Sequence, residues 1–116
     1  MLPPKDPLTP GSQMAAEIAE QPDSLARLLA QTDDIVDAVA RIKAYGPRTV
    51  LLAARGTSNN AALYLKYLLE ISLGLPVGLV SPSTFTVYGK RPDLNGVLWI
   101  AVSQSGGSAD LYEPTA

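Results

Sequence analysis

Three short apolar runs divide the second half of the chain, and each of them ends in a polar segment. The runs are Thr49–Ala54, Val77–Val80 and, most clearly, Val97–Val102. Uninterrupted apolar runs of this length are typical of strands that are covered on both faces, as in parallel sheets. The segment Ser81–Asp93 between the last two runs is mixed, and Thr84–Tyr88 within it is expected to extend briefly.

Helical spacing characterises the chain before the first strand. Between residues 13 and 45 the apolar residues recur three, four or seven positions apart, which predicts two or three helices in series. Pro22 is expected to break the first helix, with Asp23–Ser24 capping the next, and Thr32–Asp34 offers another cap. Gly46–Pro47 should end the run, because glycine tolerates the left-handed conformation and proline cannot continue a helix.

A further helix is predicted between the first two strands, from about Ser58 to Leu73, with Gly74 ending it. It is apolar on most sides, so we expect it to be well buried. Another helix should begin within Ala109–Tyr112. Strand, helix, strand, crossover and strand in this order predict an α/β domain with a parallel sheet. Since such a sheet would lack cover on part of one face, we interpret the chain as truncated.

Composition narrows the functional classes. The chain has 116 residues, enough for one domain, and a formal charge of 9 − 11 = −2, which disfavours nucleic-acid binding. It contains neither cysteine nor histidine, so disulfides, thiolate metal sites and the commonest general base are excluded. We expect no metal and no cofactor. The sequence shows no secretory signal and no apolar stretch of about 20 residues, so a cytoplasmic protein without a membrane span is expected.

Two polar loops follow the first and third predicted strands, and each precedes a helix. The first contains Gly56, Thr57 and Ser58, and the second is the run Ser103–Ser108. If the strand order is 2-1-3, the first and third strands are neighbours and both loops flank one crevice at their carboxyl ends, where α/β sheets bind ligands. Helix N-termini there favour a phosphate. Hydroxyls and amides without histidine suit a polar phosphorylated sugar.

Structural interpretations of these loops stay open beside the functional one. Thr57 or Ser58 could simply cap the following helix. The second loop has more small and amide residues than one helix cap requires. Arg55 could approach an anionic ligand or pair with an acid such as Asp110. The Walker lysine and the full G-x-G-x-x-G are missing, so a nucleotide site is not expected.

Four segments resemble the sugar isomerase (SIS) domain, specifically the isomerase half of glutamine–fructose-6-phosphate aminotransferase and its shorter relatives. They span nearly everything after the proline-rich start, in the family's order. The segments are Met14–Pro22, Gly56–Ser58, Lys66–Glu70 and Ser103–Gly106 with Ser108 and Asp110.

The resemblance implies a flavodoxin-like three-layer αβα sandwich with a parallel sheet, of which this chain is the N-terminal part. Residues 1–12 are expected to form a flexible proline-rich arm, 13–46 the N-terminal helices, and 47–116 the first part of the phosphosugar-binding domain. The residues that resemble the phosphate site are Ser103, Gln104, Ser105 and Ser108. The residues that resemble the sugar-facing loop are Gly56, Thr57 and Ser58.

The function implied is binding of a hexose phosphate, as part of an aminosugar-phosphate isomerase, aminotransferase or deaminase acting on fructose 6-phosphate or glucosamine 6-phosphate. Pairing of SIS domains into a homodimer is also implied. Arg55 stands where the aminotransferase has cysteine, and Gly107 where it has an acidic residue, which points to the shorter relatives. The family's catalytic groups are expected after Ala116, so the catalytic residues are unknown and this chain alone should be inactive.

Two other functions stay open. The chain could be a non-catalytic phosphosugar-sensing module of a regulator, although the short arm leaves no room for a DNA-binding helix-turn-helix within this chain. It could also be a structural α/β fragment without a ligand.

Overall fold

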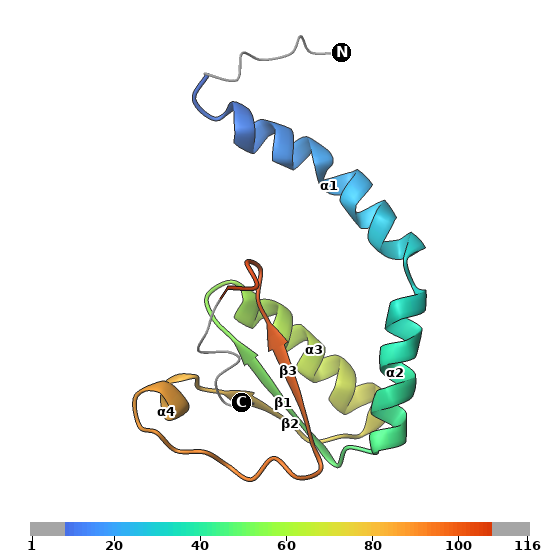
Figure 1. The fold of residues 1–116 in the computed structure, drawn as a ribbon, viewed down its shortest axis with the longest axis vertical. Coiled ribbons are helices and arrows are strands. Elements are labelled where there is room, and N and C mark those ends of the chain that lie inside the picture. The colour runs from blue at the N-terminus through green and yellow to red at the C-terminus, as the bar shows by residue number, and fades with distance from the viewer. Residues whose placement is uncertain (1–8, 108–116) are drawn as a thin grey trace. The chain divides into compact units, whose positions relative to one another are not determined.

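The computed structural model describes residues 9–107, and the chain forms two compact units that divide between Ala40 and Arg41. The first unit holds helix α1 (Ser12–Ala30) and the beginning of helix α2 (Asp33–Tyr45). The second unit holds the end of α2 and all of the sheet (Figure 1). Residues 1–8 of the expected arm lie outside the described residues.

Helix α1 is continuous through Pro22, so the predicted break there is wrong. Asp23 and Ser24 lie inside the helix and cap nothing; instead the Ser24 Oγ accepts a hydrogen bond of 2.9 Å from the Arg27 side chain. A proline removes one backbone hydrogen bond, while the turns on either side keep theirs. The alanine, glutamate, glutamine and leucine residues of α1 are strong helix formers, which sustains the helix across that gap.

The ends of α2 agree with the prediction. The helix begins at Asp33, where the Thr32 carbonyl accepts the bond from the Val36 N–H at 2.9 Å. It ends at Tyr45, and Gly46 follows with φ 64°, the left-handed conformation that glycine adopts without strain. Among residues 9–107, no helix is both long and apolar enough to cross a membrane.

Three parallel strands form the sheet, and their bounds are those predicted: β1 (Thr49–Ala54), β2 (Val77–Val80) and β3 (Val97–Val102). Their order is β2-β1-β3, which confirms the predicted 2-1-3 arrangement. Leu52 at the centre of β1 stands opposite Leu79 of β2 and Ile100 of β3. The apolar centre of the sheet therefore belongs to β1, the strand with a neighbour on each side.

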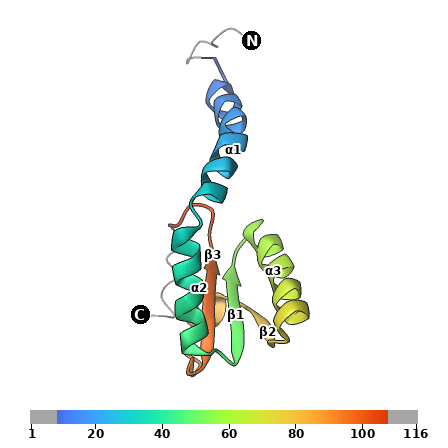
Figure 2. The same ribbon diagram turned by 90° about the vertical axis from the view of Figure 1, so that its right-hand side faces the viewer.

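Helix α3 (Ser58–Leu73) covers one face of this sheet (Figure 2). Alternate residues of a strand point to the same face, and on this face the side chains of Val50 and Leu52 are fully buried. They pack in one cluster with Ala62 of α3 and with Val77 of β2. This cluster is the core that holds the ends of the strands in place.

The prediction that α3 is well buried is wrong. Ala62 is its only buried residue in the described structure, while the Tyr64 side chain is 68% exposed and that of Ile71 is 80% exposed. Only one side of the helix meets the sheet, and Leu65 and Leu69 contact the core from that side. Apolar residues on several sides of a helix do not by themselves reveal which sides acquire a neighbour.

The opposite face of the sheet carries Trp99, because it alternates with Leu98 and Ile100, which pack toward α3. The Phe85 ring meets Trp99 edge-on at a centroid distance of 5.5 Å. Phe85 lies in a short helix, α4 (Ser83–Thr86), so the expected extension at Thr84–Tyr88 is wrong. Pro82 precedes α4 with φ −55°, a value that favours a helical turn over an extended strand.

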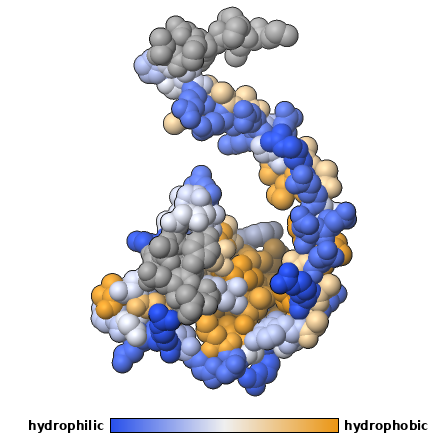
Figure 3. Space-filling model, viewed as in Figure 1, coloured by the Kyte–Doolittle hydropathy of each residue, from blue (hydrophilic) through white to orange (hydrophobic). Residues whose placement is uncertain are grey.

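The three-stranded parallel sheet with α3 on one face (Figure 2) confirms the predicted α/β fold with a parallel sheet. The space-filling view shows apolar surface gathered over the sheet on the face turned toward the viewer (Figure 3). The helix expected to begin within Ala109–Tyr112 lies outside the described residues.

Lys66 joins α3 to the edge strand. Its Nζ donates to the Val77 carbonyl at 3.0 Å and pairs with the Glu70 carboxylate one turn along the helix. We expect Lys66→Met, which keeps most of the aliphatic stem, to lower the free energy of unfolding by about 1 kcal/mol, because these half-exposed contacts are lost. Urea denaturation measures the change. The exposed Lys90→Met serves as the control, and an equal effect of both substitutions would contradict the role of Lys66.

Candidate functional site

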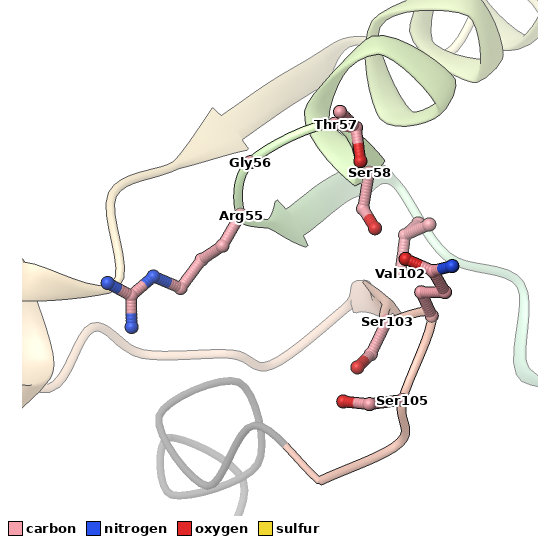
Figure 4. Close-up of a pocket in the computed structure, with 8 residues that line it drawn as sticks. Arg55, Gly56, Thr57, Ser58, Val102, Ser103 and Ser105 are labelled. Atoms are coloured by element: carbon pink, nitrogen blue, oxygen red, sulfur yellow. The ribbon is translucent and has the colours of Figure 1, made fainter. Parts of the chain in front are cut away.

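The two polar loops meet at the carboxyl ends of β1 and β3. Ala54 and Val102, the last residues of these strands, stand opposite each other in the ladder, so the loops leave the sheet side by side. Between them lies a pocket with a cavity volume of about 200 Å³ (Figure 4). We call it the loop pocket; its lining residues are Arg55, Gly56, Thr57, Ser58, Val102, Ser103, Gln104 and Ser105. The loops therefore flank one crevice, as the strand order predicts.

The first loop turns sharply into α3. Gly56 has φ 58°, which a residue with a side chain adopts only with strain. Its carbonyl accepts from the Asn59 N–H, and the Thr57 carbonyl accepts from the Asn60 N–H, both at 3.1 Å. Thr57 occupies the N-cap position but makes no side-chain capping bond, so the capping interpretation does not hold for its hydroxyl. The hydroxyls of Thr57 and Ser58 therefore lie at the N-terminus of α3, where they can bond to a ligand.

The second loop is held partly by its own serines. The Ser103 Oγ accepts a bond of 3.1 Å from the Gly106 N–H, and the Ser105 Oγ accepts one of 3.2 Å from the Gly107 N–H. Each hydroxyl acts here as an acceptor and keeps its own proton for donation. The spacing of serine two or three residues before glycine is the sequence signal for such local turns, and it gives these serines a structural role besides any contact with a ligand.

The structure brings every candidate site residue to the loop pocket except Ser108, which lies outside the described residues. Gln104 is exposed and Ser103 is half-buried. In Figure 4 the Ser103 and Ser105 hydroxyls both point into the space between the two loops. The site therefore offers hydroxyl donors from two neighbouring strand ends.

Positive potential at the loop pocket comes from two sources. The N-terminus of α3 opens beside it, and the first turn of that helix contains no acidic residue to offset the positive end of the helix dipole. Arg55 is the one charged residue among the described lining residues. Its side chain points away from Ser103 and Ser105 (Figure 4). Asp110, the acid weighed as its partner, lies outside the described residues.

These groups suit an anion better than a metal ion. Within residues 9–107, no group of three or more carboxylate, imidazole or thiol side chains is placed to hold a metal. The lining offers hydroxyls, one amide and one guanidinium, which donate hydrogen bonds to phosphate oxygens. None of these lining groups is a carboxylate or an imidazole that could carry a proton between adjacent carbons of a sugar.

Comparison with known proteins finds relatives that match most of this chain. No protein-family model matches the chain. The glutamine–fructose-6-phosphate aminotransferase (isomerizing) of Methanothermobacter thermautotrophicus is 34% identical to it over 97 residues, 84% of this chain and 16% of that protein. The crystal structure of a proposed phosphosugar isomerase from Silicibacter pomeroyi is 40% identical and superimposes with a TM-score of 0.77, over 84% of this chain and 30% of that one.

The chain thus spans less than a third of the length of either relative. Both similarities extend over most of the chain at substantial identity, and the second includes the three-dimensional fold. The three-stranded parallel unit is therefore a partial SIS-like fold, and the chain is related to the sugar isomerase (SIS) domains of these proteins.

Proposed function

We propose that the loop pocket binds the phosphate of a hexose 6-phosphate, either fructose 6-phosphate or glucosamine 6-phosphate. The observation that carries the proposal is the convergence of Ser103 and Ser105 with Thr57 and Ser58 beside the N-terminus of α3. A phosphate dianion placed there would accept bonds from these hydroxyls and lie at the positive end of the helix dipole. The names of the two relatives, which concern sugar phosphates, support the same ligand class.

The proposed role in the longer protein is substrate binding within an aminosugar-phosphate isomerase, aminotransferase or deaminase. Proton transfer between adjacent carbons needs a base, and the described lining supplies none. We therefore assign phosphate recognition to this chain and the chemical step to residues beyond it or on a partner subunit. Association into a homodimer and a cytoplasmic location stay predictions.

Two-dimensional amide NMR tests the proposal directly. Addition of fructose 6-phosphate or glucosamine 6-phosphate should shift the amide signals of residues 56–60 and 103–107, because those N–H groups surround the loop pocket. The unphosphorylated sugars are the matched controls and should leave these signals in place. Well-dispersed spectra without shifts, or the same shifts with both forms of the sugar, would contradict phosphate binding at this pocket.

A further inference from the structure

The face of the sheet opposite α3 is apolar and is only partly covered in the described part of the chain. We call it the open face; it is formed by Leu51, Val80, Trp99 and Ala101. Among the described helices only α3 packs along the sheet, and apolar surface remains on the other side (Figures 2 and 3). Leu51 on the open face is therefore partly exposed, whereas the next residue, Leu52 on the α3 side, is fully buried.

Trp99 leaves a hydrogen-bond donor unpaired on this face. Its indole Nε1 is buried and has no hydrogen-bond acceptor among residues 9–107. A buried donor without an acceptor destabilises a protein, and native structures nearly always supply one. The open face therefore lacks both an apolar covering and an acceptor.

Helix α1 carries an apolar surface that supplies both. The α1 stripe lies on one side of the helix, with spacings of three, four or seven, and each member is at least 56% exposed: Met14, Ile18, Leu25, Leu28 and Leu29. No residue of α1 is buried, although helices in proteins gain most of their stability by packing such a face. Gln21 lies on the same side, four positions before Leu25, and its amide oxygen is an acceptor.

The charges of the two units indicate which surface the α1 stripe fits. Residues 1–40 contain two basic and seven acidic side chains, a net charge of −5. Residues 41–116 contain seven basic and four acidic side chains, a net charge of +3. Two N-terminal units repel each other, which disfavours the pairing of one α1 stripe with another. The N-terminal unit of one molecule instead attracts the sheet unit of a second molecule.

We propose that the open face is the docking surface for the α1 stripe of a second copy of this chain, and that two copies exchange their α1 helices. The Trp99 Nε1–H of one copy then donates to the Gln21 amide oxygen of the other. One docked helix covers roughly 28 by 10 Å, less than the roughly 800 Å² that a stable interface buries on each partner. Reciprocal exchange doubles the contact, because each copy contributes both a stripe and an open face.

Sedimentation velocity and fluorescence on the 116-residue chain test the exchange together, since Trp99 is the only tryptophan in the sequence. Between about 1 µM and 1 mM protein we expect a monomer–dimer equilibrium. The emission of Trp99 should move to shorter wavelength in step with the dimer fraction, because the docked helix removes water from the open face. Raising the salt concentration from about 0.05 to 0.5 M should weaken the dimer about threefold or more, since the attraction between the units is screened.

A pair of leucine variants assigns the surface. Leu25→Gln places an amide within the α1 stripe and keeps a good helix former, so the dissociation constant of the dimer should rise about tenfold or more. Leu73→Gln makes the same change on α3 at a similar exposure, 63% against 60% for Leu25, and should leave the constant within about twofold.

Several outcomes would overturn the exchange. A monomer at every concentration would do so, as would a dimer that Leu25→Gln does not weaken or that forms without a change in the Trp99 emission. A monomer whose Trp99 emission shifts in Leu25→Gln at all concentrations would mean that α1 covers the open face of its own chain. A dimer that salt does not weaken would remove the charge argument for this pairing. No sugar phosphate enters the test, so its result leaves the proposed function untouched.

Discussion

Leu52→Ala is expected to lower the free energy of unfolding by about 2–5 kcal/mol, the range for removing a fully buried leucine side chain. Leu52 has no exposed surface and lies at the centre of the middle strand, with Leu79 and Ile100 beside it in the sheet and Ala62 above it in the core cluster. Because these neighbours belong to three different elements, the surroundings cannot collapse into the cavity without moving the strands. Urea denaturation followed by circular dichroism measures the loss.

The matched control is Leu73→Ala. It makes the same chemical change at the end of α3, where the side chain is 63% exposed. A loss of about 0.5 kcal/mol or less is expected there, as for most surface substitutions. If Leu52→Ala lowered the free energy of unfolding by less than about 1 kcal/mol, the core would lie elsewhere.

Ser105→Ala is expected to raise the dissociation constant of fructose 6-phosphate by about tenfold or more. The substitution removes a hydroxyl donor aimed into the loop pocket, and a hydrogen bond to a charged group contributes about 1.5–3 kcal/mol. It also removes the acceptor of the Gly107 N–H, so the loop loses one of its own contacts. Calorimetry on the folded variant measures the affinity.

Two further variants serve as controls. Ser105→Thr retains the hydroxyl, which can serve both the phosphate and the Gly107 N–H, and should recover most of the affinity. Ser72→Ala changes an exposed serine near the C-terminal end of α3, at the opposite end of that helix from the pocket, and should not alter binding. An unchanged affinity in Ser105→Ala would remove this residue from the site.

The strands and α3 could be predicted to the residue because local features mark their ends. Each strand is an apolar run with glycine, proline or serine within two residues of each end, and Gly74 with φ 64° ends α3 as its position in the sequence indicates. The crevice could be predicted as well. Once the strand order is 2-1-3, parallel strands place the loops after β1 and β3 at one edge of the sheet.

Other features were not predicted correctly. Pro22 remains inside α1 because the strong helix formers around it outweigh one missing hydrogen bond. By contrast, α4 replaces an extended segment where Phe85 meets Trp99, and the exposure of Tyr64 depends on which side of α3 meets the sheet. These last two outcomes are set by neighbours distant in sequence, which outweigh local propensity.

The candidate residues of the loop pocket follow from residue types and spacing alone, but the direction in which each side chain points does not. The sequence places hydroxyls, an amide and glycines directly after β1 and β3, which determines the chemical groups that the proposed site offers. The direction of the Arg55 side chain, away from Ser103 and Ser105, is seen only in the folded chain (Figure 4). A long side chain has many rotamers of similar energy, and only the surrounding tertiary structure selects one of them.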